Sequence, residues 1–228
     1  TADQLHALSK QRYQQIDDPV GEAFATLGRI SCALGGDDLK SAEQLLDRAL
    51  ETFSATSQLE GLFRCAWFET YICILKNRKS EARAATEAIS VLLPQFDAPM
   101  RANHFIRLLL LSLELGDIDS ATESVEEIAR VSDSLDAYQM IHHQAALAAF
   151  HACKRAPGEA ARRFEIVEAS LRRIGLATSL LADALTIFAR HVHIDHPEMR
   201  DRALEQARSI YQKLGSRRRL EWLEKRMQ

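Results

Sequence analysis

The stretch Gln144–Val167 reads QAALAAFHACKRAPGEAARRFEIV and combines two helical patterns with a break between them. The break is Ala156-Pro157-Gly158, because proline and glycine are unfavourable inside a helix. After the break, Ala160, Phe164 and Val167 are spaced four and three residues apart, which places them on one helix face. Small residues on facing helices allow close approach, so the stretch predicts an antiparallel helical hairpin.

The anchor set of the second helix recurs along the chain. The five sets are Ala42/Leu46/Ala49, Ala82/Thr86/Ile89, Ala121/Val125/Ile128, Ala160/Phe164/Val167 and Ala203/Ala207/Ile210. Their first alanines lie 40, 39, 39 and 43 residues apart. A repeat of near-constant period indicates stacked units, each of which buries one face against the next.

These repeats predict an all-α fold, and no stretch alternates apolar and polar residues as a strand would. We expect an α-solenoid of about five hairpins with a period of about 40 residues, forming a single domain over residues 1–228. A first helix is expected at 2–16 and a capping helix at 216–228. The hairpins are expected at 20–57, 58–94, 97–133, 136–175 and 177–215. Their short connections make neighbouring helices antiparallel.

Composition narrows the class of protein. The net charge of −3 gives no general reason to expect nucleic acid as a partner. No apolar run approaches the roughly 18 residues of a membrane helix, and the opening TADQLHALSK does not resemble a signal peptide. The four cysteines form no Cys-x-x-Cys pair and lie in apolar helical stretches. Buried thiols in a reducing compartment are expected, hence a cytoplasmic location.

No pattern of catalytic or cofactor-binding residues stands out. The segment Gly35–Ser41 lacks the glycine that precedes the lysine of a phosphate-binding loop, and its two acids would repel a phosphate. Two histidine groups are candidates for a metal: His191, His193 and His196, and separately His142, His143 and His151. Their spacings do not place three ligands on one helix face, so no metal, no cofactor and no enzymatic activity are expected.

The C-terminal segment is basic. Residues 200–228 hold nine lysines and arginines against four acids, and Arg217-Arg218-Arg219 forms a run. A nucleic-acid patch is one interpretation. A solvated capping helix with Leu220 and Leu223 directed inward is the preferred one, because terminal repeats need a polar outer face.

The pattern of small residues resembles tetratricopeptide repeats, although that family usually has a period of 34 residues. It is most similar to the longer variant in MalT-like regulators of the LuxR class and in adenylyl-cyclase-linked bacterial signalling proteins. Asp18–Ala23 before Leu27-Gly28, and the ending Ala207–Ser216, carry this resemblance. The unit at 64–92 departs from the pattern with Glu69-Thr70. The resemblance implies a right-handed superhelix whose first helices line a concave groove.

The groove implied by the resemblance supplies the candidate partner-binding residues. They are Arg29, Arg64, Trp67, Tyr71, Asn103, Arg107, His142, Arg190 and His193. A large aromatic residue beside arginines is typical of an interaction hot spot. Packing of Trp67 and Tyr71 between repeats is the alternative interpretation.

The resemblance implies a non-catalytic protein-interaction or ligand-sensing module, part of a larger bacterial signalling or transcription regulator. A stand-alone assembly or chaperone-adaptor scaffold is the alternative, and an enzyme that uses the late histidines is a third hypothesis. The expected partner is a protein or peptide in the groove, with a small-molecule effector and a homodimer through the terminal helices as further options. No membrane contact is expected, nor nucleic-acid binding through this domain.

Overall fold

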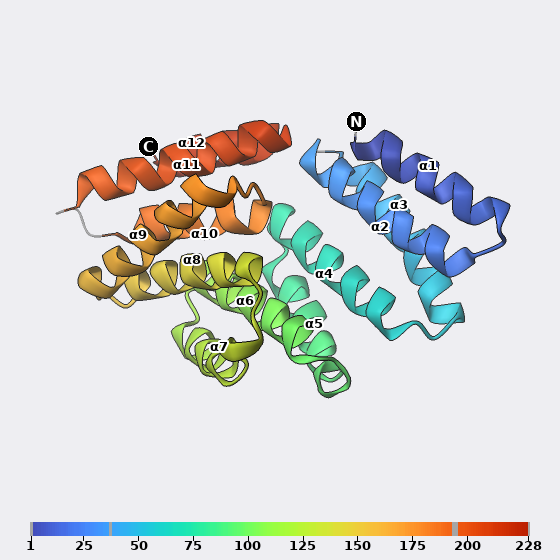
Figure 1. Ribbon diagram of the computed structural model, residues 1–228, viewed down its shortest axis with the longest axis horizontal. Coiled ribbons are helices and arrows are strands. Elements are labelled where there is room, and N and C mark those ends of the chain that lie inside the picture. The colour runs from blue at the N-terminus through green and yellow to red at the C-terminus, as the bar shows by residue number, and fades with distance from the viewer. Residues whose placement is uncertain (1, 37, 193–195, 228) are drawn as a thin grey trace. The chain divides into compact units, whose positions relative to one another are not determined.

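The computed structural model describes residues 2–36, 38–192 and 196–227, and these are helical without any β-strand (Figure 1). The all-α prediction is therefore confirmed. The chain divides into two compact units, Thr1–Gln95 and Phe96–Gln228. The expectation of one continuous superhelical domain over residues 1–228 stays a prediction.

Unit 1 consists of helices that pack against their neighbours along the chain, α1 with α2, α2 with α3, α3 with α4 and α4 with α5. Their bounds are α1 Ala2–Gln15, α2 Pro19–Gly35, α3 Leu39–Ala55, α4 Leu59–Leu75 and α5 Lys79–Ser90, followed by the short 3₁₀ helix η1 Leu93–Gln95. The core includes Ile30, Leu46 and Phe53, and the ring of Phe24 lies 4.9 Å from that of Phe53.

The described residues of unit 2 form three helical hairpins and a further helix. Its helices are α6 Ala98–Leu115, α7 Ile118–Arg130, α8 Ala137–Cys153, α9 Pro157–Ile174, α10 Ser179–His191, α11 Pro197–Leu214 and α12 Arg217–Met227, with the 3₁₀ helix η2 at Ser132–Ser134. The first helices of the hairpins pack in succession, because α8 contacts both α6 and α10. Helix α10 also contacts α6 directly. This packing brings together side chains that are far apart in the sequence.

The repeated alanines occupy the close contacts that the sequence predicts. Ala42, Ala82, Ala121, Ala160 and Ala203 are all fully buried. The other anchor residues are buried as well, apart from Val125, which is half-buried. An alanine at each of these points lets the second helix approach its partner closely, since a larger side chain would hold the backbones apart.

Several of the turns between helices share one geometry. In each of them the backbone N–H after the turn donates to the carbonyl five residues earlier, and the residue before it has a positive φ. This closure, a Schellman motif, satisfies carbonyls left over at the helix end. The positive-φ residues of these turns are Asp17, Ser57, Asn77, Gly116, Arg155 and Gly215. Aspartate then caps many of the following helices, for example Asp18, whose carboxylate accepts from the N–H of Gly21 at 2.8 Å.

Helix α1 is fitted to α2 through two glycines. A Cβ atom at Gly21 would lie 2.3 Å from the ring of Tyr13, and one at Gly28 would lie 2.3 Å from the ring of His6. Because both pairs lie between antiparallel helices, each α1 ring fills the space left by one missing side chain. The fit is supplemented by ion pairs, Lys10 with Glu22 at 3.0 Å and Arg29 with Asp3 at 3.1 Å.

Candidate functional site

The candidate residues of unit 1 take two kinds of position. Arg29 is half-buried on α2, and its Nε donates to Asp3 on α1, so this guanidinium holds a neighbouring helix. Arg64 is exposed on α4, where it pairs with Glu60 at 2.6 Å and lies 5.9 Å from the ring of Phe24. Arg64 is therefore the more accessible of the two arginines.

The aromatic candidates of unit 1 both lie on α4 and are half-buried. Tyr71 packs against the hydrophobic core of unit 1, beside the buried Ile72. Its ring therefore contributes to packing, which was the alternative interpretation. Trp67 lies one helical turn earlier on the same helix and retains part of its surface.

The candidate residues of unit 2 come from its three successive first helices. Asn103 and Arg107 are half-buried on α6, His142 on α8 and Arg190 on α10. The positive charge of Arg107 on α6 adds to the lowering of the His142 pKa that burial causes, and opposes the rise of the Asp183 pKa that burial causes. His193 lies outside the described residues.

His142 links α8 to the start of α10. Its Nε2 lies 2.7 Å from the hydroxyl oxygen of Thr178, which also accepts the backbone N–H of Leu181. One imidazole N–H of His142 donates to the backbone of Tyr138. The other ring nitrogen of the neutral imidazole, Nε2, therefore accepts the hydrogen bond from the Thr178 hydroxyl. Burial, together with the charge of Arg107, lowers the pKa of His142 to about 4. His142 is therefore neutral at physiological pH.

A half-buried carboxylate, Asp183, forms the centre of a polar cluster in unit 2. The hydroxyl of Tyr211 donates to Asp183 Oδ1 at 2.6 Å, and Nη2 of Arg219 donates to Oδ2 at 3.3 Å. Tyr211 is fully buried and Arg219 is 5% exposed. Burial raises the pKa of Asp183, while Arg219 and Tyr211 oppose that rise by favouring the charged form.

The cluster continues from α10 to α6 and α12. Arg190 makes a two-pronged contact with Glu114, with Nη2 to Oε1 at 2.7 Å and Nη1 to Oε2 at 3.4 Å. The ring of Trp222 lies 5.9 Å from the guanidinium carbon of Arg190 and 5.2 Å from that of Arg219. We call these residues the Asp183 cluster: Glu114, Asp183, Arg190, Tyr211, Arg219 and Trp222. It joins α6, α10, α11 and α12 into one polar contact region.

Sequence reasoning did not find most of the Asp183 cluster. The interpretation of Arg217–Arg219 as a solvated run is wrong for Arg219, which is buried on Asp183. One signal was present, since Asp183 is a single acid within the apolar segment 180–189. A lone carboxylate in such a segment needs a buried partner, although the sequence alone does not say which residue supplies it.

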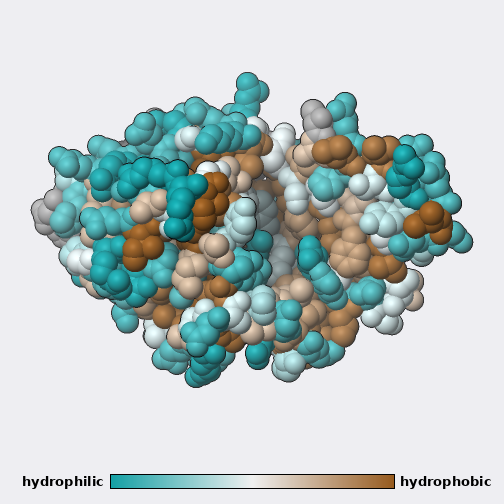
Figure 2. Space-filling model, viewed as in Figure 1, coloured by the Kyte–Doolittle hydropathy of each residue, from teal (hydrophilic) through white to brown (hydrophobic). Residues whose placement is uncertain are grey.

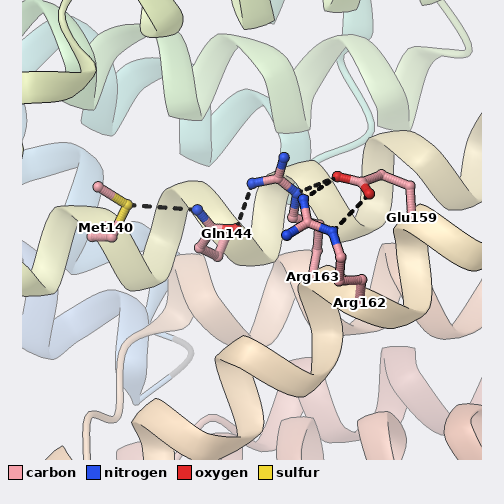
Figure 3. A network of polar contacts seen from close by, with 5 residues as sticks. All are labelled: Met140, Gln144, Glu159, Arg162 and Arg163. Atoms are coloured by element: carbon pink, nitrogen blue, oxygen red, sulfur yellow. Dashed lines mark hydrogen bonds and ion pairs between the residues drawn. The ribbon is translucent and has the colours of Figure 1, made fainter.

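A second polar network joins α8 and α9 (Figure 3). Glu159 accepts hydrogen bonds from Arg162 and Arg163, and Arg163 also donates to Gln144 at 2.9 Å. The hydrogen bonds from these two arginines hold the pKa of Glu159 at about 2. Gln144 in turn donates to the sulfur of Met140. The network lies along the surface of one hairpin and connects its two helices.

The histidines and cysteines do not assemble a reactive centre within the described part of the chain. There, no three His, Cys, Asp or Glu side chains are placed to hold a metal ion. The histidine triplet that ends at His196 includes His193, which lies outside that part. All four cysteines are free thiols. Burial raises the pKa of Cys65 to about 12 and that of Cys153 to about 11, so these thiols stay protonated.

Helix α1 exposes an apolar face. Leu5 and Leu8 of α1 are 67% and 50% exposed, and Ile16 in the turn after the helix is 70% exposed. Apolar surface is visible over this part of unit 1 in Figure 2. Asp3 and Lys10 of the same helix pair with Arg29 and Glu22 of α2. The homodimer expected through the terminal helices stays a prediction.

Comparison with known proteins adds no assignment, because no family model and no curated protein matches the chain. None of the helices in the described ranges combines the length and the apolar character that crossing a membrane requires.

Proposed function

We propose that the protein is a non-catalytic binding module with tetratricopeptide-like hairpins arranged as a right-handed α-solenoid. The surface of α6, α8 and α10 receives a protein or peptide, with Asn103, Arg107 and His142 as contact residues. Support comes from the buried alanine at each repeat, and from the successive packing of these first helices. In such arrays the first helices form the recognition surface.

The charged side chains of α6 and α10 support the proposal beyond what the fold alone supports. Helices α6 and α10 bring together charged side chains that are far apart in the sequence, as the contact between Glu114 and Arg190 shows. Arg107 lies within electrostatic reach of both His142 and Asp183 and retains part of its surface. A half-buried guanidinium among rigid helices is pre-ordered, which reduces the entropy cost of binding a partner.

We further propose that the module acts within a larger bacterial regulator, where it senses a partner or a small-molecule effector in the cytoplasm. The motif resemblance to MalT-like and cyclase-linked regulators supports this context. The four free cysteines are compatible with a reducing compartment.

The test compares two charge reversals in unit 2. Arg107→Glu alters the proposed surface, whereas Arg162→Glu makes the same change on α9, where Arg162 pairs with Glu159 of its own helix. Immobilised full chain is used to isolate partners from a lysate of the source organism, and binding of each partner is then measured by calorimetry. Circular dichroism melting confirms that both variants fold.

We expect Arg107→Glu to weaken binding by about tenfold or more, equivalent to about 1.4 kcal/mol, and Arg162→Glu to leave it unchanged. Equal affinity of both variants, or loss only with Arg162→Glu, contradicts the assignment of the surface to the first helices. Retention of the wild-type affinity for every isolated partner by Arg107→Glu also contradicts it.

A further inference from the structure

Helix α12 contacts the rest of unit 2 through side chains that resemble the anchors of a bound peptide. Arg219 and Trp222 lie three residues apart and therefore share one face of the helix. Arg219 reaches the Asp183 carboxylate, and Trp222 lies beside the Arg190 guanidinium. Leu223 is buried next to them. Arginine and tryptophan are the residues most enriched among interaction anchors.

The groups that receive α12 are oriented by the other helices of unit 2. Asp183 comes from α10, and its Oδ1 is held by the hydroxyl of Tyr211 from α11, which leaves Oδ2 for Arg219. Arg190 likewise comes from α10 and is held by Glu114 from α6. Neither of these supporting contacts involves α12. The receiving surface is therefore pre-ordered without the helix that occupies it.

Helix α12 is too short to be stable by itself. It has 11 residues, and an isolated helix of that size is unstable in water. Its glutamates Glu221 and Glu224 and its Arg217 are exposed. The helix thus depends on a few anchor side chains and on the receiving surface for its structure.

We propose that the α10 face carrying Asp183 and Arg190 is a docking surface for a helix that presents an arginine and, three residues later, an aromatic residue. In this inference α12 is the resident occupant, and a partner helix with the same anchors displaces it. The partner that fits is a helical segment with the spacing Arg-x-x-Trp, because a carboxylate receives the guanidinium and Arg190 receives the ring face. The inference goes beyond the proposed function because it names Asp183 and Arg190 of α10 as the receiving groups. Its test needs no natural partner, so the two proposals can fail separately.

The experiment uses a fluorescent peptide of residues 216–227 and the full chain. The double variant Arg219→Gln, Trp222→Ala loses both anchors of its own α12 and leaves the receiving surface intact. We expect the peptide to bind this variant at least tenfold more tightly than wild type in fluorescence anisotropy, since the resident helix no longer competes. Adding Asp183→Asn to the double variant is expected to abolish that binding.

Matched peptides separate anchor recognition from simple charge. A peptide with Arg219→Gln is expected to lose binding, whereas one with Arg217→Gln, which alters an exposed arginine of the same helix, keeps it. Equal loss from both peptides indicates non-specific attraction of a basic peptide and overturns the inference. So does a folded double variant that fails to bind, or binding that Asp183→Asn leaves unchanged.

A second measurement tests the same inference if the double variant does not fold. Hydrogen exchange of the single variant Trp222→Ala is compared with wild type, and Trp222 is only half-buried. The amides of α12 are expected to exchange at least tenfold faster while those of α10 and α11 keep their protection. Uniform acceleration across α10, α11 and α12 shows that α12 is an integral part of the core, which contradicts a displaceable occupant.

Discussion

Tyr211 and Asp183 are joined by a 2.6 Å hydrogen bond between the two helices of the last hairpin, with the phenol donating to the carboxylate. Tyr211 is the largest fully buried side chain of the protein's described part. Its ring packs in the core, while its hydroxyl supplies one of the hydrogen bonds that the Asp183 carboxylate accepts. One residue thus connects the packing of the hairpin to the orientation of the Asp183 cluster.

Tyr211→Phe is expected to destabilise the protein by about 2 kcal/mol, because it removes a buried hydrogen bond to a charged group and keeps the ring. Urea unfolding followed by circular dichroism measures the change. Tyr138→Phe removes a hydroxyl from a residue that is 53% exposed and is expected to have no effect. If both variants have the stability of wild type, the Tyr211 hydroxyl makes no net contribution.

The helical hairpins could be predicted because their signal is local. Ala160, Phe164 and Val167 repeat the spacing of the other anchor sets, and a helical period is visible within one turn of sequence. The helix ends were similarly accessible, since α9 begins at Pro157 and ends before Gly175 as expected. Backbone rules of this kind need no knowledge of which helices become neighbours.

The Asp183 cluster could not be predicted because it depends on which helices stack. Glu114 and Arg190 lie 76 residues apart, and their contact follows from the direct approach of α10 to α6. The sequence also does not distinguish Arg219 from Arg217, although one is buried and the other exposed. That difference arises from the orientation of α12, which tertiary contacts determine.

Gly28→Ala is expected to destabilise the docking of α1 by about 1–3 kcal/mol, because its new methyl group would lie 2.3 Å from the His6 ring. Hydrogen exchange in α1 measures this local effect. Adding His6→Ala removes the obstructing ring, so the double variant is expected to recover part of the loss. Gly158→Ala is the matched control, since nothing lies within 4 Å of that position. Equal effects at the two glycines contradict the proposed fit of His6 onto Gly28.

Arg155→Gly is expected to stabilise the protein by up to about 1 kcal/mol. Arg155 has a φ of 56°, a left-handed conformation in which its Cβ is strained, and glycine relieves that strain. The gain is partly offset, since glycine increases the freedom of the unfolded chain. Gly116→Ala introduces the same strain at a φ of 75° and is expected to cost about 1 kcal/mol. Thermal melting of both variants tests the pair, and changes of the same sign in both contradict the argument.

Stability is expected to fall as the pH drops from 7 to 5, because buried histidines resist protonation. Burial lowers the pKa of His104, His142 and His143 to about 4, with nearby arginines adding to the effect. In the unfolded chain the three histidines bind protons near pH 6.5, whereas in the folded chain they do not. The loss of stability therefore begins near pH 6.5 and is complete near pH 4. By this linkage, each histidine lowers the free energy of unfolding by about 2 kcal/mol as the pH falls from 7 to 5. His143→Gln should therefore reduce the pH dependence of urea unfolding by about that amount. An unchanged dependence, or a His143 NMR resonance that titrates near pH 6.5 in the folded protein, contradicts it.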